Sequence, residues 1–331
     1  MKGLVTWIES SGAWAPWGFL GLFIAASFLM IWRLETMKAG GVEGTVLGTL
    51  VMPYCSGMGN LIFAFVLGIK GGPGAEVLTN SLVNNVTNLT FLIGFPAALW
   101  GMHVLPATTS KKKKPDRKEH KINRLSLLLT LTAVLFFTGA TWALAADGKL
   151  DAGDGLVLVG LFLFWQCFHA FEVLKSNVRQ NKSWSWMLPI DLALLGLGAY
   201  GIYVSTDWLV DWLCKIPTGF ISAQYLGWLS GWLMVLPNGL LAFYYAWRGN
   251  PEVVYASQVG DGHISIPLCL GIFALYHPIK VPASFQTGVE ILLGAAAVHF
   301  FFVALFGRLP RWMGWVLTAS YAVFLYKGLT R

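Results

Sequence analysis

The chain has 331 residues, of which 56% are hydrophobic and only 12% carry a charge. Soluble domains contain about a quarter charged residues, so this composition excludes an ordinary soluble domain, and the 15% aromatic content excludes a disordered chain. Four cysteines in so long a chain exclude a disulfide scaffold, and their spacing is not that of a metal site. We therefore predict an all-α integral membrane protein.

Apolar segments follow one another along the whole chain. A helix needs roughly 20 apolar residues to cross a bilayer, and about ten segments approach or exceed this length. Residues 1–11 lack the cleavage pattern of a signal peptide. The predicted spans lie near residues 14–33, 43–69, 74–102, 123–146, 152–174, 187–206, 218–247, 253–277, 286–306 and 310–328.

Basic residues are concentrated in alternate loops of this predicted topology. Arg33, the basic loop at 104–123 and Arg248 fall on one side, whereas the opposite loops carry mostly Asp. Because cytoplasmic loops are enriched in Lys and Arg, we place both termini outside a bacterial or archaeal cytoplasmic membrane. The same bias accounts for the net charge of +7. We interpret the loop as a topology anchor in contact with anionic lipids and expect no nucleic-acid binding.

The sequence contains a weak internal repeat. Residues 60–65 match residues 238–243, and the segments that follow, 79–94 and 256–271, align without a gap. An odd number of predicted spans separates the starts of the two copies, so the copies enter the membrane from opposite sides. Inverted repeats of this kind are typical of secondary transporters, where interrupted helices supply the binding site near the midplane. We therefore predict two inverted five-helix repeats, at 1–174 and 175–331.

Polar residues lie inside the apolar spans of both copies. In the first copy they have helical spacings of three and four, which puts most of them on one face. Such residues need a partner or a hydrated cavity in a membrane. This polar stripe, formed by Asn80, Asn84, Asn85 and Asn88, could either coordinate a cation or lock helices together. Its duplication in the second copy favours contact with an ion. The aligned pairs are Asn80 with Ser257, Asn84 with Asp261, and Asn88 with Ser265.

This arrangement resembles the cation/Ca²⁺ exchanger superfamily. Its two alpha-repeats read roughly G-T-S-x-P-E and then G-N-x-x-G-S-N-I-x-[ND]. In this chain the first motif falls at 55–60 and 233–238, and the second falls at 79–88 and 256–265. The alpha-1 region would then cover 44–94 and the alpha-2 region 222–271. The resemblance implies a sodium/calcium-exchanger-like fold that transports an inorganic cation (Na⁺, Ca²⁺ or H⁺), with no cofactor besides that ion.

Both acidic positions of the family are replaced here. The last residue of each first motif is usually a Glu that binds the divalent ion, whereas this chain has Asn60 and Asn238. Because Ca²⁺ affinity depends strongly on ligand charge, we expect weak Ca²⁺ binding and coupling to a monovalent ion or a proton. Asp261, where the family usually has Ser, is the best remaining acid. It is either a functional group, the default for an intramembrane acid, or a hydrogen-bonded structural residue.

The resemblance implies a cation site at the membrane midplane. Its expected ligands are Asn60, Asn88, Asn238 and Ser265, with Asn84 and the coupling acid Asp261 flanking them. His263 beside Asp261 could tune a proton-coupled step or simply pack. The secondary candidates are Ser56, Asn80, Asn85, Ser257 and His263.

Two rival interpretations stand beside the transporter. The first is a transport-inactive exchanger-like scaffold or subunit that binds another membrane protein; the two lost carboxylates favour it, and the polar stripe retained in both copies opposes it. The second is a membrane-embedded metalloenzyme using His169, Glu172, His277 or His299. Only one His/Glu pair has helical spacing, so we expect no enzymatic activity.

Overall fold

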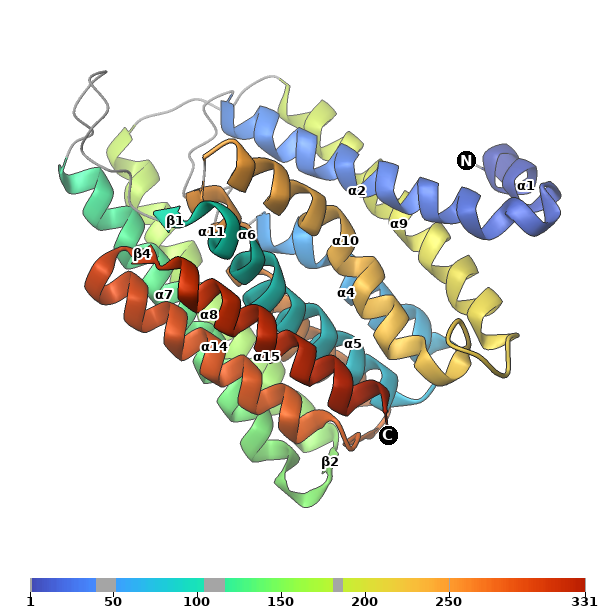
Figure 1. Ribbon diagram of the computed structural model, residues 1–331. Helices are drawn as coiled ribbons and strands as arrows, with labels where there is room; N and C mark the ends of the chain where they lie inside the picture. The colour runs from blue at the N-terminus through green and yellow to red at the C-terminus, as the bar shows by residue number, and fades with distance from the viewer. Residues whose placement is uncertain (1, 40–51, 104–116, 181–186, 250, 331) are drawn as a thin grey trace.

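The computed structural model describes residues 2–39, 52–103, 117–180, 187–249 and 251–330 (Figure 1). Within these ranges the chain is almost entirely helical. The elements in chain order are α1 Lys2–Ser10, η1 Gly12–Trp14, α2 Ala15–Ala39, α4 Met52–Ile69, α5 Gly74–Val86, η3 Thr87–Leu92, α6 Ile93–Trp100, β1 Met102–His103, α7 Arg117–Leu144, η4 Ala145–Asp147, β2 Lys149–Leu150, α8 Ala152–Gln180, α9 Leu188–Cys214, η5 Ala223–Tyr225, α10 Leu226–Trp247, α11 Pro251–Gly260, α12 Gly262–Ile264, η6 Ser265–Cys269, α13 Leu270–Tyr276, β3 Ile279–Lys280, α14 Phe285–Phe306, β4 Arg308–Leu309 and α15 Arg311–Leu329.

The predicted all-α membrane fold is confirmed, because each predicted span overlaps at least one helix. Among the described residues, seven helical segments are long and apolar enough to cross a bilayer, and two shorter apolar helices cover Gly57–Ile69 and Ala152–Phe168. The number of ten spans stays a prediction. The sixth span runs on to Cys214, and the helix of the seventh begins only at Leu226. Pro217 and Gly219 interrupt the helical structure between these two helices, and the φ of Gly219 is +101°.

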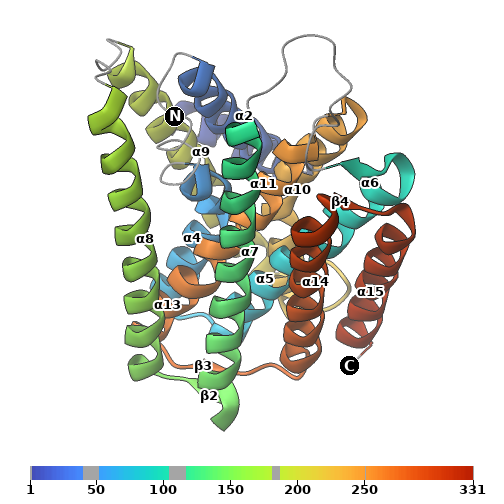
Figure 2. The same cartoon turned by 90° about the vertical axis from the view of Figure 1, so that its left-hand side faces the viewer.

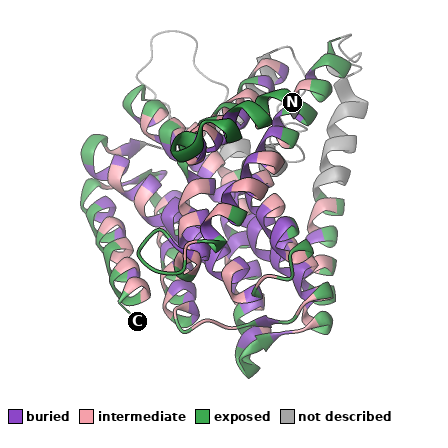
Figure 3. Ribbon diagram, turned by 90° about the vertical axis from the view of Figure 1, so that its right-hand side faces the viewer, coloured by how far each residue is buried: buried purple, intermediate pink, exposed green. Residues whose placement is uncertain are grey.

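The helices pack in pairs around a buried centre. α5 packs against α10 in the middle of the molecule, α15 packs against α6, and α2 and α9 lie side by side along one edge (Figure 1). α7 packs against α14, and α8 packs against α13 (Figure 2). Buried residues fill the centre, while the outer faces of the helices are exposed (Figure 3). These outer faces carry large apolar side chains such as Phe164 and Leu305, as expected for surfaces in contact with lipid.

Short antiparallel strand pairs close the two ends of the bundle. β1 pairs with β4, with Met102 opposite Leu309. β2 pairs with β3 at the other end of α7, with Leu150 opposite Ile279 (Figure 2). These pairs satisfy backbone groups where the chain leaves one helix for the next.

A π-helix interrupts the second polar helix of each sequence copy. η3 spans Thr87–Leu92 in the first copy, and η6 spans Ser265–Cys269 in the second. The aligned residues Asn88 and Ser265 therefore both lie in π-helical turns. Single π-helical turns are rare and frequently occur at functional sites.

Aligned glycines let the helix that follows each π-helix approach a neighbour closely. A Cβ on Gly94 of α6 would lie 3.0 Å from the carbonyl oxygen of Gly314 in α15. A Cβ on Gly271 of α13 would lie 3.1 Å from the carbonyl oxygen of Gly155 in α8. Small residues at such crossings allow the backbone contact that drives helix association in membranes. The two copies thus share this close packing.

Charged side chains hold both ends of α9. Arg33 of α2 contacts Asp191 at 3.1 Å, and both side chains are only 8% exposed. At the other end of α9, the Lys70 Nζ lies 2.7 Å from Asp207 Oδ1 and 2.6 Å from Asp211 Oδ1. Burial lowers the pKa of Lys70, but hydrogen bonds to both carboxylates outweigh this effect and raise the pKa above its usual value. Lys70 is therefore a cation that ties the end of α4 to α9.

Candidate cation-binding site

Asp261 is the buried carboxylate at the centre of the candidate site. It lies between α11 and α12 and is 0% exposed. Asn88 Nδ2 donates a hydrogen bond to Asp261 Oδ2 at 3.0 Å, and Asn238 Nδ2 donates to the same oxygen at 2.8 Å. Asn88 belongs to the first sequence copy, whereas Asn238 and Asp261 belong to the second. The structure therefore joins the polar residues of both copies at one carboxylate.

Ser265 supports this carboxylate from one turn away. Its hydroxyl donates to the carbonyl oxygen of Asp261 at 2.9 Å and accepts a hydrogen bond from Asn85 Nδ2 at 2.7 Å. Ser81 Oγ donates to the carbonyl oxygen of Ser265 at 2.8 Å. These bonds fasten η6 to α5, so Ser265 and Asn85 orient the backbone that carries Asp261.

Asn60 and Asn84 are two further buried amides. Asn60 in α4 is 1% exposed, Asn84 in α5 is 0% exposed, and neither the oxygen nor the nitrogen of either amide has a hydrogen-bond partner among the described residues. Asn88 Oδ1 is likewise without one. A buried polar group left unsatisfied costs about 1–3 kcal/mol. Amide oxygens of this kind are ligands for hard cations.

The secondary candidates divide by their contacts. Asn80 Nδ2 donates to Ser230 Oγ at 3.0 Å and thereby ties α5 to α10. Ser257 is half-buried and accepts a 3.4 Å hydrogen bond from Gln258. His263 Nε2 lies 3.0 Å from the carbonyl oxygen of Thr130 in α7. The side chain of Ser56 lies outside the described residues.

Gln258 is a polar residue near the site that the sequence analysis missed. It is 1% exposed, its Nε2 donates to the carbonyl oxygen of Asn238 at 3.4 Å, and its Oε1 has no hydrogen-bond partner among the described residues. Its position three residues before Asp261 in an apolar span was the available signal, because that spacing places both residues on one helical face.

His299 is a second buried residue that supports the site. Its Nε2 lies 2.7 Å from the carbonyl oxygen of Leu89 in η3, and its Nδ1 lies 3.2 Å from the hydroxyl of Tyr255. A carbonyl only accepts hydrogen bonds, so Nε2 carries the proton and Nδ1 accepts from Tyr255. Leu89 follows Asn88 directly, so this bond holds the π-helical turn that presents Asn88 to Asp261.

Replacing His299 with Leu should therefore destabilise the π-helical turn that carries Asn88. We expect His299→Leu to lower the free energy of unfolding by about 2–4 kcal/mol, because the buried Leu89 carbonyl and Tyr255 hydroxyl both lose their partner. Chemical unfolding in mixed micelles measures the loss. His299→Gln keeps a donor for Leu89 and should recover about half of it. Equal stability of His299→Leu and wild type would contradict this role.

The metal-enzyme interpretation receives no support from the described part of the chain. No group of three or more His, Cys, Asp or Glu side chains there is placed to hold a metal ion. His277 Nε2 lies 3.1 Å from the carbonyl oxygen of Gly68, and His299 is committed to Leu89 and Tyr255. The side chains of His169 and Glu172 lie outside the described residues.

The fold and the buried polar centre define a multi-pass helical membrane protein with a polar site in its interior. A family model described as "Sodium/calcium exchanger protein" matches residues 12–171 and 190–327. The chain belongs to the sodium/calcium exchanger family, which confirms the predicted resemblance. Family membership supports transport by cation exchange.

Solved structures of an exchanger have a fold similar to that of this chain. The sodium-calcium exchanger NCX_Mj soaked with 2.5 mM Na⁺ and 10 mM Sr²⁺ has a TM-score of 0.64 and 20% identity, over 93% of this chain and 95% of that one. The same exchanger soaked with zero Na⁺ and Ca²⁺ has a TM-score of 0.63 and 19% identity, over 94% and 98% of the two chains. A comparison with curated proteins found no significant match.

Proposed function

We propose that this chain is a secondary exchanger that carries one monovalent cation at a time, with Asp261 binding the cation and a proton in alternation. One observation carries the proposal: a single buried carboxylate is held by one amide from each sequence copy. Among the described residues the other buried carboxylate is Asp191, which pairs with Arg33. One negative charge balances one monovalent ion, whereas a divalent ion would leave an uncompensated charge in a medium of low dielectric constant.

The surrounding amides supply neutral ligands. Asn88 and Asn238 present their N–H groups to Asp261. A half-turn of each amide group would present its oxygen instead, so a cation beside Asp261 would replace the two N–H donors. The buried amides of Asn60 and Asn84, without hydrogen-bond partners among the described residues, add further oxygens. A site of one carboxylate and several amide oxygens suits Na⁺ or a similar ion.

The exchange would follow alternating access of the two repeats in a bacterial or archaeal cytoplasmic membrane, with both termini outside. The basic side of the topology carries Arg33 and Arg248, and the positive-inside rule places that side in the cytoplasm. No cofactor enters this scheme. The exchanged cation is the substrate.

A cation screen tests the proposal. The purified protein is melted in Na⁺, K⁺, Ca²⁺ and Mg²⁺ at constant ionic strength. A ligand at one hundred times its Kd adds about 2.7 kcal/mol to the apparent stability, so we expect one monovalent ion to raise the Tm. Asp261→Asn should abolish this rise, and in proteoliposomes it should abolish Na⁺- or pH-dependent flux. Glu290→Gln, which neutralises an exposed acid of α14, is the matched control.

The transport-inactive scaffold is the second candidate, and the same screen separates it. The replacement of both family carboxylates by Asn60 and Asn238 favours it. A scaffold would show no cation-dependent Tm and no flux while remaining folded. That outcome would overturn the exchanger proposal.

A further inference from the structure

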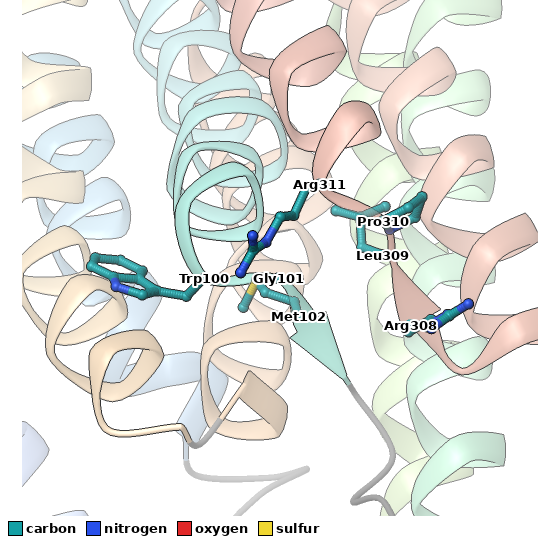
Figure 4. Close-up of a pocket in the computed structure, with 7 residues that line it drawn as sticks. All are labelled: Trp100, Gly101, Met102, Arg308, Leu309, Pro310 and Arg311. Atoms are coloured by element: carbon teal, nitrogen blue, oxygen red, sulfur yellow. The ribbon is translucent and has the colours of Figure 1, made fainter.

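An open pocket lies at the end of the bundle where β1 pairs with β4 (Figure 4). Its volume is about 390 Å³, which is in the range of small-ligand sites. The end of α6, the strand pair and the start of α15 form its walls. The residues that line it are Trp100, Gly101, Met102, Arg308, Leu309, Pro310 and Arg311.

The pocket carries unbalanced positive charge. Arg308 and Arg311 are both exposed, and the ion pairs found among the described residues include neither of them. Arg124 of α7 reaches the same region, where it donates to the carbonyl oxygen of Ala304 in α14. Acidic residues gather at the opposite end: Asp147 and Asp151 flank β2, and Glu290 lies near the start of α14.

Exposed aromatic side chains surround this end of the bundle. Trp100 is 41% exposed, Phe306 58% and Trp312 59%. Aromatic side chains of this kind gather at the level of lipid headgroups. The pocket therefore opens where the phosphates of a bilayer lie.

The two arginines are placed differently at the pocket. Figure 4 shows Arg311 reaching from the start of α15 toward Gly101, whereas the side chain of Arg308 extends from β4 away from Arg311. Gly101 has a φ of +71°, so a residue with a side chain would be strained there. A Cβ at this position would lie 3.7 Å from Arg311 Nε, so the glycine leaves that side of the exposed Arg311 side chain open. Guanidinium groups bind phosphate oxygens in a bidentate manner.

We propose that this pocket binds the phosphate group of an anionic phospholipid, with Arg311 as the principal contact and Arg308 as a second positive charge. Basic pockets between membrane helices are suited to such headgroups. The acyl chains would lie along the apolar outer faces of α6 and α15. The pocket is separate from Asp261, so the proposal does not depend on which ion is transported.

Lipid titration of the full-length protein tests this site. The protein in neutral detergent is titrated with dioleoyl phosphatidylglycerol, dioleoyl phosphatidylcholine or inorganic phosphate, and binding is read by native mass spectrometry and by the Tm. We expect phosphatidylglycerol to bind more tightly than phosphatidylcholine. Its affinity should fall about 5-fold for each arginine removed and on the order of 25-fold in R308Q/R311Q, because each basic residue near such lipids contributes about 1 kcal/mol.

R248Q is the matched control, because Arg248 is an exposed arginine on the same predicted side of the membrane but does not line the pocket. It should bind phosphatidylglycerol as the wild type does. Should R308Q/R311Q not fold, R308Q and Arg311→Lys replace it, and each should still weaken binding. Unchanged affinity in the pocket variants, or an equal loss in R248Q, would overturn the proposal. Inorganic phosphate as effective as the lipid would assign the pocket to a soluble anion and overturn the lipid source.

Discussion

Replacing both Asn60 and Asn238 with Glu is expected to give the protein a Ca²⁺-dependent thermal stability that the wild type lacks. The change adds two negative charges at buried positions, one of them at position 238, whose side chain contacts Asp261, and Ca²⁺ affinity rises with the number of charged oxygen ligands. At a Ca²⁺ concentration one hundred times the new Kd, the apparent free energy of unfolding should rise by about 2.7 kcal/mol. Thermal melts with and without Ca²⁺ measure the gain.

The control for this experiment is Asn60→Gln with Asn238→Gln. Gln has nearly the size of Glu but adds no charge, so this variant should show no response to Ca²⁺. Without any divalent ion, the Glu variant should be less stable than the Gln variant, because buried carboxylates without a partner are costly. A Ca²⁺ response in the Gln variant, or none in a folded Glu variant, would show that charge at these two positions does not determine ion selectivity.

Breaking the buried ion pair between α2 and α9 should cause the largest loss of stability. Arg33 and Asp191 lie 3.1 Å apart with side chains 8% exposed, and removing one partner of a buried pair costs about 3–5 kcal/mol because it strands the other charge. We expect Arg33→Met to lower the free energy of unfolding by that amount. Reversible unfolding in mixed micelles measures it.

The double variant Arg33→Met with Asp191→Leu separates the stranded charge from lost packing. It removes both charges, so it should be much closer to wild type than either single variant. If the losses instead came from disrupted packing between α2 and α9, the losses of the two single variants would add in the double variant. Lys70→Met is a useful comparison, because its partners Asp207 and Asp211 are exposed and the loss should stay near 1 kcal/mol.

The helices and their order could be predicted because the membrane imposes a simple rule. A segment of about 20 apolar residues must be helical in a bilayer, since its backbone groups have no other partners there. The repeat was detectable for a similar reason, because polar residues are costly in a membrane and their duplication stands out. The end of the sixth span was wrong by several residues, because Asp207 and Asp211 indicated a loop, whereas both carboxylates pair with Lys70 and the helix continues to Cys214.

The roles of individual polar residues could not be predicted in the same way. Asn80, Asn85 and Asn88 belong to one polar stripe in the sequence, yet Asn80 bonds Ser230, Asn85 bonds Ser265, and Asn88 bonds Asp261. Spacing determines which face a residue occupies, but its partner comes from another helix. His299 shows the same limit, because its contacts with Tyr255 and Leu89 join segments that are far apart in the sequence.

The sequence by itself determined that this is a helical membrane protein with two related polar segments and an exchanger-like plan. It also showed that positions 60 and 238 hold Asn rather than an acid. These features depend on local composition and on residue identity, which the sequence states directly. Only the tertiary structure decided that Asn88 and Asn238 converge on one oxygen of Asp261, and that Asn60 and Asn84 are buried without hydrogen-bond partners among the described residues. Such contacts depend on the relative rotation and depth of packed helices, which are set by side-chain packing across the whole bundle.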